Sequence, residues 1–260
     1  MVSASTLFAQ AKSTKAKDLP VSGPIELALQ PDVFRGHVKS FPRVLPGPDI
    51  GSDIVEKINA SLARGDQRVR STAMDCRKSS KEAQGKSDPG AWEREISVTM
   101  RGPRFLAFRV TDNYYCGGTY PSFGMETSFV YDLTLGTPVN WLKWLPPEVK
   151  GYLDTASDGS QVGLVKWPAL LTLSRNQADN ECKDVFKAEE GVAYSLNVDA
   201  RAGTLDARPA TFPHVIQACA DTVPLDLSTL RKLGVSSDLI DVLESAHALQ
   251  HAAKTAPRLK

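Results

Sequence analysis

Two runs of alternating apolar residues in the first half of the chain restrict its fold more than any other feature. Apolar side chains stand at every second position in residues 96–100 and again in residues 106–110. A period of two is typical of a strand with one buried face. The four residues between the runs, Arg101-Gly102-Pro103-Arg104, have the composition of a turn, so the two runs predict a β-hairpin.

Further alternating segments extend this β pattern along the chain. Residues 129–133 predict a third strand that Gly136 stops, and residues 25–29 predict a short first strand. In the second half, residues 192–198 alternate again, and a partner strand begins at residues 203–205 after a short turn. The sequence therefore predicts a second hairpin there.

A helix is predicted directly after Gly51-Ser52-Asp53, which supplies a helix N-cap. Large aliphatic residues recur every four positions from residue 50 and form one apolar stripe, which we expect to pack on the sheet of the first hairpin. We expect this helix to end near Gly65, because glycine is unfavourable inside helices. Residues 67–84 are polar and are predicted to be helical in part. The stripe consists of Ile50, Ile54, Ile58 and Leu62.

The remaining elements are mostly helical. Residues 227–233 and 237–249 predict two closing helices. Residues 170–173 form a short apolar run, and such a run does not distinguish a helix from a strand. Trp141 and Trp144 predict a helical or turn-like cluster whose indole rings belong to the core rather than to a ligand platform.

Helices and antiparallel hairpins alternate without a regular β-α-β rhythm, which predicts an α+β fold with antiparallel sheets, packed helices and two sub-domains. Residues 1–23 are assigned to an export-signal remnant or leader and a linker, and residues 251–260 to a tail. An N-terminal α+β domain is placed in residues 24–145 and a C-terminal one in residues 146–250. A chain of 260 residues is long enough for two small domains.

The composition excludes several classes of protein. The formal net charge is +1, whereas a dedicated nucleic-acid binder would usually carry a clear basic excess. No run of about 18 apolar residues occurs, so no transmembrane helix is expected. The signatures of α/β-hydrolases, zinc peptidases, P-loop enzymes and dinucleotide-binding folds are missing from the sequence.

The four cysteines are far apart, and no C-x-x-C pair occurs, which excludes the usual zinc-ribbon and thioredoxin-like motifs. They are either buried thiols of a reducing compartment or two disulfides of an oxidising one. Residues 9–11 have the A-x-A pattern of a signal-peptidase site. This favours export, although residues 1–11 have neither a full apolar core nor a basic start. The cysteines are Cys76, Cys116, Cys182 and Cys219.

Two sets of residues are candidates for catalysis or metal binding. His247 and His251 are four residues apart on a predicted helix, but no acidic third ligand is nearby in the sequence, so no metal and no cofactor is expected. Asp112 and Asp132 flank the segment after the first hairpin and could form the carboxylate pair of a glycosidase, about 5 Å apart in retaining enzymes. A strand-end turn at Asp112 and a strand position at Asp132 explain them more simply.

The segment Tyr114-Tyr115-Cys116-Gly117-Gly118-Thr119-Tyr120-Pro121-Ser122 follows the first hairpin directly. Two adjacent glycines allow backbone conformations that other residues avoid. Tyrosine combines a flat apolar ring with a polar hydroxyl, and it is common at recognition surfaces. The segment is therefore a candidate binding surface formed by Tyr114, Tyr115, Gly117, Gly118 and Tyr120, together with Asp132. The alternative is a turn whose tyrosines cover a sheet edge.

The order of four segments resembles a bacterial envelope domain family. These are "FPRVLPG" at 41–47, "IVEKINASL" at 54–62, "DNYYCGGTYPS" at 112–122 and "VYDLTLGTPVNW" at 130–141. The family occurs in the extracellular part of the lysozyme-sensing anti-sigma factor RsiV and in the non-catalytic part of a peptidoglycan deacetylase. Its hallmark is an aromatic residue before Gly-Gly-Ala-His, followed by Tyr-Asp-Leu-x-x-Gly. Thr119-Tyr120 replace the Ala-His in this chain.

The resemblance implies an exported, non-enzymatic binding module, periplasmic or secreted. A lysozyme-like cell-wall hydrolase is the implied partner, which would make the protein inhibitor-like or immunity-like. A peptidoglycan-binding accessory protein and a cryptic cell-wall glycan hydrolase are the alternatives. Export favours two disulfides. We predict Cys76–Cys116 and Cys182–Cys219, which keep each bridge within one half of the chain, while the other two connectivities stay open.

Overall fold

The computed structural model describes residues 21–34, 36–85, 91–117, 125–156, 158–188 and 191–255. In these ranges the fold is α+β and is built on three antiparallel sheets, as the sequence predicts. The short sheet consists of β1 (Leu27–Ala28) and β2 (Arg43–Val44). The four-stranded sheet has the order β3-β4-β5-β6, and the five-stranded sheet has the order β11-β10-β9-β8-β7.

The strands of the four-stranded sheet are β3 (Trp92–Arg101), β4 (Phe105–Tyr114), β5 (Met125–Asp132) and β6 (Thr137–Pro138). Those of the five-stranded sheet are β7 (Lys150–Thr155), β8 (Gln161–Lys166), β9 (Tyr194–Asp199), β10 (Thr204–Pro209) and β11 (Val223–Leu225). Both predicted hairpins are confirmed, as β3–β4 and β9–β10. The predicted third strand is confirmed as β5.

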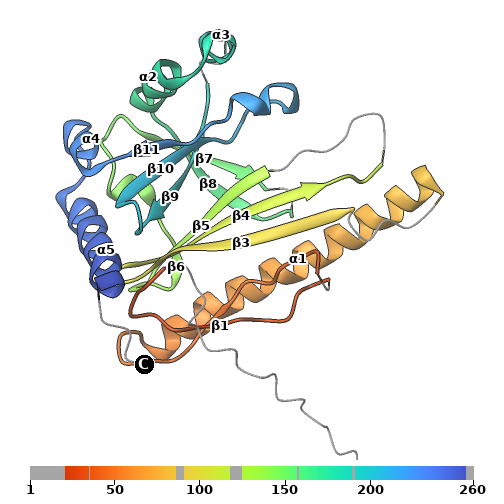
Figure 1. Ribbon diagram of the computed structural model, residues 1–260, viewed down its shortest axis with the longest axis horizontal. Helices are drawn as coiled ribbons and strands as arrows, with labels where there is room; N and C mark the ends of the chain where they lie inside the picture. The colour runs from red at the N-terminus through yellow and green to blue at the C-terminus, as the bar shows by residue number, and fades with distance from the viewer. Residues whose placement is uncertain are drawn as a thin grey trace, which may run out of the picture.

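The long helix α1 (Ser52–Gln84) crosses one face of the four-stranded sheet (Figure 1). Its apolar stripe is buried against residues of β3, β4 and β5, which confirms the predicted packing. The expectation that the helix ends near Gly65 is wrong, because the helix continues for almost twenty residues beyond it. A Cβ atom at Gly65 would lie 3.3 Å from the ring of Phe41, so the glycine permits a close ring contact rather than ending the helix.

The C-terminal half of α1 is fixed by a second apolar cluster. Val69, Ala73 and Cys76 on the helix are buried together with Trp92 of β3. Residues 67–84 look too polar for a buried helix, yet only this narrow stripe needs to be apolar. The partly helical segment predicted from the sequence is therefore helical throughout, and it ends in Gly85, a left-handed C-cap.

The five-stranded sheet packs on the other face of the four-stranded sheet, and helices cover its outer side (Figure 1). These helices are α2 (Pro168–Gln177), α3 (Asn180–Ala188), α4 (Leu227–Lys232) and α5 (Ser237–Thr255). Two 3-10 helices are also present, η2 (Trp141–Lys143) before β7 and η3 (His214–Cys219) before β11. The two closing helices are confirmed. Pro168 at the first turn of α2 resolves the ambiguous run at residues 170–173 in favour of a helix.

One large apolar cluster joins the two sheets. Met100, Phe105 and Val130 of the four-stranded sheet share it with residues of the five-stranded sheet and of α5, so the core continues across residue 145. Trp141 is buried in the same cluster and Trp144 packs against it partly buried, as predicted for these indole rings, and Trp167 is buried there as well. Val21, which the sequence assigns to a linker, is buried there as well, and the neighbouring Ser22 accepts a hydrogen bond from Gln250 of α5.

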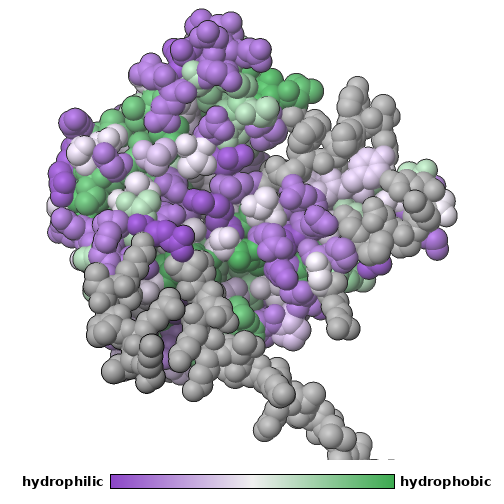
Figure 2. All heavy atoms as spheres, viewed as in Figure 1, coloured by the Kyte–Doolittle hydropathy of each residue, from purple (hydrophilic) through white to green (hydrophobic). Residues whose placement is uncertain are grey.

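Both predicted disulfides are present, Cys76–Cys116 and Cys182–Cys219, and they use all four cysteines. Two disulfides are typical of proteins from oxidising compartments. Among the described residues, no helix has the length and apolar character needed to cross a membrane. The face of the molecule in Figure 2 is largely hydrophilic along α2 and α3, and its hydrophobic residues form separate patches.

Candidate functional site

The described part of the tyrosine segment packs against α1 and β3. The ring of Tyr114 stacks on that of Trp92 with 4.5 Å between centroids, and the backbone N–H of Tyr115 donates to the carbonyl of Ala91. Burial raises the pKa of the Tyr114 hydroxyl, and the charge of Asp112 adds to this effect. Tyr114 is therefore half-buried and contributes to packing at this end of the sheet.

Gly117 has a structural reason to be glycine. Its φ angle is 86°, and a Cβ atom there would lie 2.8 Å from the Cβ atom of Ala83 on α1. The disulfide from Cys116 to Cys76 pulls the chain this close to the helix. Gly118 and Tyr120, the other two residues of the predicted surface, lie outside the described residues.

Asp112 belongs to a buried ion cluster. Arg94 is 1% exposed, and it donates to both carboxylate oxygens of Asp112 at 2.7 and 2.6 Å and to Asp158 at 3.1 Å. The indole N–H of Trp92 also donates to Asp112, at 2.9 Å. Burial opposes the charge of Arg94, but the two carboxylates outweigh it and raise its pKa. Asp158 comes from the β7–β8 connection, so this cluster joins the two sheets.

Asp132 closes the turn after β5. Its carboxylate accepts hydrogen bonds from the backbone and hydroxyl of Thr134 at 2.8 and 2.7 Å and from Arg104 at 2.8 Å. Burial alone would raise the pKa of Asp132, but these hydrogen bonds lower it overall. Gly136 follows at φ 71° and lies close to Lys57 of α1. In this chain the Tyr-Asp-Leu-x-x-Gly pattern thus shapes a turn against α1.

The two aspartates do not form a catalytic pair. Asp112 is opposite Met125 in the β4–β5 ladder, whereas Asp132 is opposite Phe105. Seven residue steps separate these positions, which corresponds to about 23 Å along a strand. Paired carboxylates of glycosidases are at most about 9.5 Å apart. The geometry therefore does not fit a mechanism that uses both groups.

The two histidines of α5 contact each other instead of a third ligand group. The Nε2 atoms of His247 and His251 are 3.0 Å apart, and Nδ1 of His247 lies 3.2 Å from the carbonyl oxygen of Ala200. Within the described ranges, no three His, Cys, Asp or Glu side chains come together as a metal site. His247 connects the middle of α5 to the β9–β10 turn.

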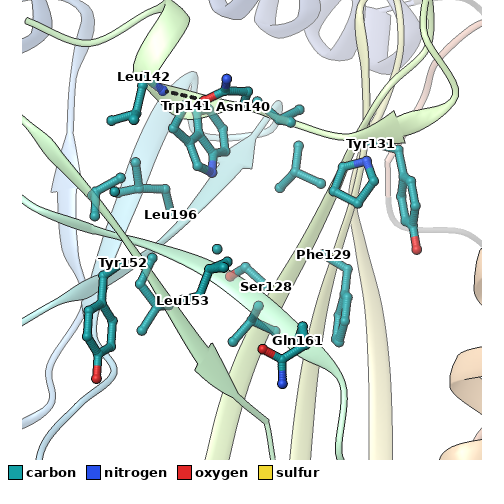
Figure 3. Close-up of a pocket in the computed structure, with 18 residues that line it drawn as sticks. Ser128, Phe129, Tyr131, Asn140, Trp141, Leu142, Tyr152, Leu153, Gln161 and Leu196 are labelled. Carbon is teal, nitrogen blue, oxygen red and sulfur yellow. Dashed lines mark hydrogen bonds between the residues drawn. The ribbon is translucent and has the colours of Figure 1, made fainter.

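A groove of about 710 Å³ lies between β5 and the β7–β8 hairpin. Figure 3 shows aromatic side chains from three elements around it: Phe129 of β5, Trp141 of η2 and Tyr152 of β7. Leu153, which is 73% exposed, and Leu142 add aliphatic surface. The groove thus combines apolar walls with a few polar groups, as ligand sites commonly do. Its polar groups come from Ser128, Asn140 and Gln161.

The edge of β5 is open where it borders this groove. β6 pairs only with Tyr131 and Asp132, and the next hydrogen bond joins the N–H of Val139 to the carbonyl of Val130. Beyond it the chain turns into η2, and no other strand of the described ranges pairs with this edge of β5. Alternate residues of an antiparallel strand direct their backbone groups to the same side. The N–H and C=O of Ser128 therefore face the same side as those of Val130, toward the groove.

The opposite wall is held by a hairpin that is fixed at both ends. β8 pairs with β9 only at Val165 and Tyr194, which anchors the base of the hairpin in the five-stranded sheet. At the tip, Asp158 joins the buried Arg94 cluster, and the hydroxyl of Ser160 accepts two hydrogen bonds from Arg68 of α1. The β7–β8 hairpin is thus anchored at its base and at its tip, and the groove lies between this hairpin and the edge of β5.

No local sequence pattern predicts this groove. Its lining comes from residues 128–142, 151–165 and 196, and no short motif unites them. The one signal present was the glycine pair Gly151 and Gly163 in a region that otherwise alternates weakly. A Cβ atom at Gly163 would meet nothing within 4 Å, which marks open space at that wall.

No protein-family model matches the chain. No curated protein matches it either. Among solved structures, the chain is similar to a member of the DUF3298 family from Bacteroides fragilis. The two share 14% identity with a TM-score of 0.49, and the alignment covers 90% of this chain and 100% of the other.

Proposed function

We propose that the chain is an exported, non-enzymatic binding protein of the bacterial envelope, and that the groove between β5 and the β7–β8 hairpin is its binding site. The groove carries the proposal, because it presents exposed apolar side chains such as Leu153 on a hairpin held at both ends. Preformed, rigid surfaces lose little conformational entropy on binding. The two disulfides support export to an oxidising compartment, the periplasm or the cell exterior.

The partner class follows from the resemblance of residues 41–47, 54–62, 112–122 and 130–141 to the envelope domain family. A lysozyme-like cell-wall hydrolase is the proposed partner, so the protein would act as an inhibitor or immunity-like factor. Peptidoglycan is the second candidate, favoured by the aromatic rings of Phe129 and Tyr152 along the groove, because sugars stack on such rings.

Titration calorimetry with a purified lysozyme tests the proposal. We expect Leu153→Asp to weaken binding more than about tenfold. A few central side chains carry most of the binding energy of an interface, and the aspartate replaces such an apolar contact with a charge. Val215→Asp is the matched control: Val215 is 84% exposed and lies on η3, outside the groove. It should bind as the wild type does.

Two outcomes would contradict this assignment. Equal loss in both variants would place the binding surface elsewhere, and no binding by the wild-type protein would exclude the lysozyme as partner. A parallel titration with soluble peptidoglycan fragments distinguishes the second candidate. Fragment binding that Leu153→Asp abolishes would identify the groove as a glycan site.

A further inference from the structure

Both walls of the groove offer backbone hydrogen-bonding groups that have no strand partner in the part of the chain that the structure describes. On β5 these are the N–H and C=O of Ser128, as described above. At the turn of the β7–β8 hairpin, the N–H of Ala156 donates to the carbonyl of Ser160. Because hydrogen-bonded pairs alternate along an antiparallel ladder, the even-numbered residues of β8 are those whose backbone groups bond to β7. Gly163 and Gln161 therefore direct their backbone groups away from β7. They lie past Val165, the residue at which β8 pairs with β9.

An open strand edge is suited to one kind of ligand. Its alternating N–H and C=O groups match those of another extended backbone, and side chains of the added strand then enter pockets at alternate positions. The edge at Ser128 is lined by the apolar side chains of Phe129, Trp141 and Leu153. Backbone pairing and apolar pockets thus occur together in the same groove.

The charge around the groove is uneven. Lys150 and Lys166 are opposite each other in the β7–β8 ladder, so they share one face of the hairpin. The ammonium group of Lys166 lies 4.7 Å from the ring centroid of Tyr152, which lines the groove. No carboxylate among the described residues is within ion-pair distance of either lysine, whereas Glu126 on β5 is matched by Arg109 at 3.5 Å. Asp154 is the one carboxylate on these two strands, so the β7–β8 hairpin keeps an excess of one positive charge over its two lysines and one aspartate.

We propose that the groove binds an extended acidic segment of a partner protein, which adds as a strand to the edge of β5 and places a carboxylate at Lys150 and Lys166. This deepens the proposed function and rests on it for the location of the site. The backbone of Ser128 supplies the pairing, the aromatic wall supplies the pockets, and the two lysines set the direction and the acidic preference of the segment.

A display library of random dodecapeptides, selected on the full-length protein, provides the probe. We expect the enriched peptides to have a proline-free, alternating core with an acidic residue toward one end. Two synthetic versions of each enriched peptide are then made, one N-methylated at the odd-numbered amides and the other at the even-numbered amides. Strand addition predicts that one parity loses binding more than about tenfold in fluorescence anisotropy while the other keeps it, because only alternate amides face the edge.

Protein variants test the same contacts from the other side. Ser128→Pro removes the outward N–H and should abolish peptide binding. The variant should still fold, because proline is tolerated where the N–H of an edge strand faces away from the sheet. Ser128→Ala keeps that N–H and is the matched control. The double variant Lys150→Gln/Lys166→Gln should lose the preference for acidic over neutral peptides, and Lys232→Gln, an exposed lysine on α4, should not.

The results separate this inference from the proposed function. Failure to enrich any peptide, equal loss for both N-methyl parities, or enriched peptides without acidic residues would each overturn strand addition by an acidic segment. Lysozyme binding that depends on Leu153 but not on Ser128 would leave the proposed function standing and reject this mode. Peptide binding that follows the predicted parity without any lysozyme binding would support strand addition and reject the lysozyme as partner.

Discussion

Two aromatic-rich regions of this molecule differ in what their rings contact. At the end of β4, Tyr114 stacks on Trp92, and the backbone beside it is joined to α1 by a disulfide. In the groove, Phe129 and Tyr152 belong to different sheets and line a common hollow. The first region is dense in sequence and its described part is closed in space, whereas the second is scattered in sequence and open. Aromatic density along a chain is thus a poor guide to a free surface.

The ion cluster beside Tyr114 gives the largest expected effect. Arg94→Met leaves Asp112 and Asp158 buried without their cation and should destabilise the protein by about 3–5 kcal/mol in urea unfolding. Lys187→Met removes an exposed ion pair with Asp184 and should leave the urea midpoint close to that of the wild type, because water screens exposed pairs. If both variants unfold at the same urea concentration, the cluster does not hold this end of the sheet together.

The disulfide in the same region comes next. Replacing both Cys76 and Cys116 by alanine releases a cross-link over 40 residues of sequence separation and should cost about 2–4 kcal/mol. Thermal unfolding with and without a reducing agent provides the measurement. Reductant should lower the melting temperature of the wild type more than that of the double variant, which keeps only Cys182–Cys219. An equal shift would show that the first bridge contributes nothing to stability.

Tyr114→Ala compares the two regions directly. Loss of the stacked, half-buried ring should destabilise the protein by about 1–3 kcal/mol and leave lysozyme binding unchanged. Chemical unfolding and calorimetry on the same sample measure both effects. Weaker binding at unchanged stability would instead assign recognition to the segment that begins at Tyr114, as the sequence alone suggests.

Leu153→Asp should have the smallest effect on stability, within about 0.5 kcal/mol of the wild type, because its side chain is already 73% exposed. Urea unfolding measures this beside the binding experiment. A large loss of stability would mean that Leu153 packs against the molecule, and the groove would then lose its most exposed apolar contact.

Local sequence patterns predicted much of the fold but little of the site. The alternation in residues 96–110 was enough to identify β3 and β4, because a half-buried strand needs a period of two. The sequence predicts the end of α1 near Gly65, almost twenty residues too early, because a glycine that receives the ring of Phe41 looks the same in sequence as one that ends a helix. Gly118 and Tyr120 lie outside the described residues, so the predicted surface stays a prediction there.

What the sequence determined by itself was the set of elements and the number of cysteines available for bridges, because periodicity and residue type act over a few neighbouring positions. Tertiary structure decided everything that depends on distant pairs. It placed Asp112 and Asp132 at opposite ends of one ladder and brought Asp158 to Arg94. It also opened a groove at Ser128, where β6 ends before the edge of β5 is covered. An edge is left free by the length and path of other strands, and no local pattern encodes that.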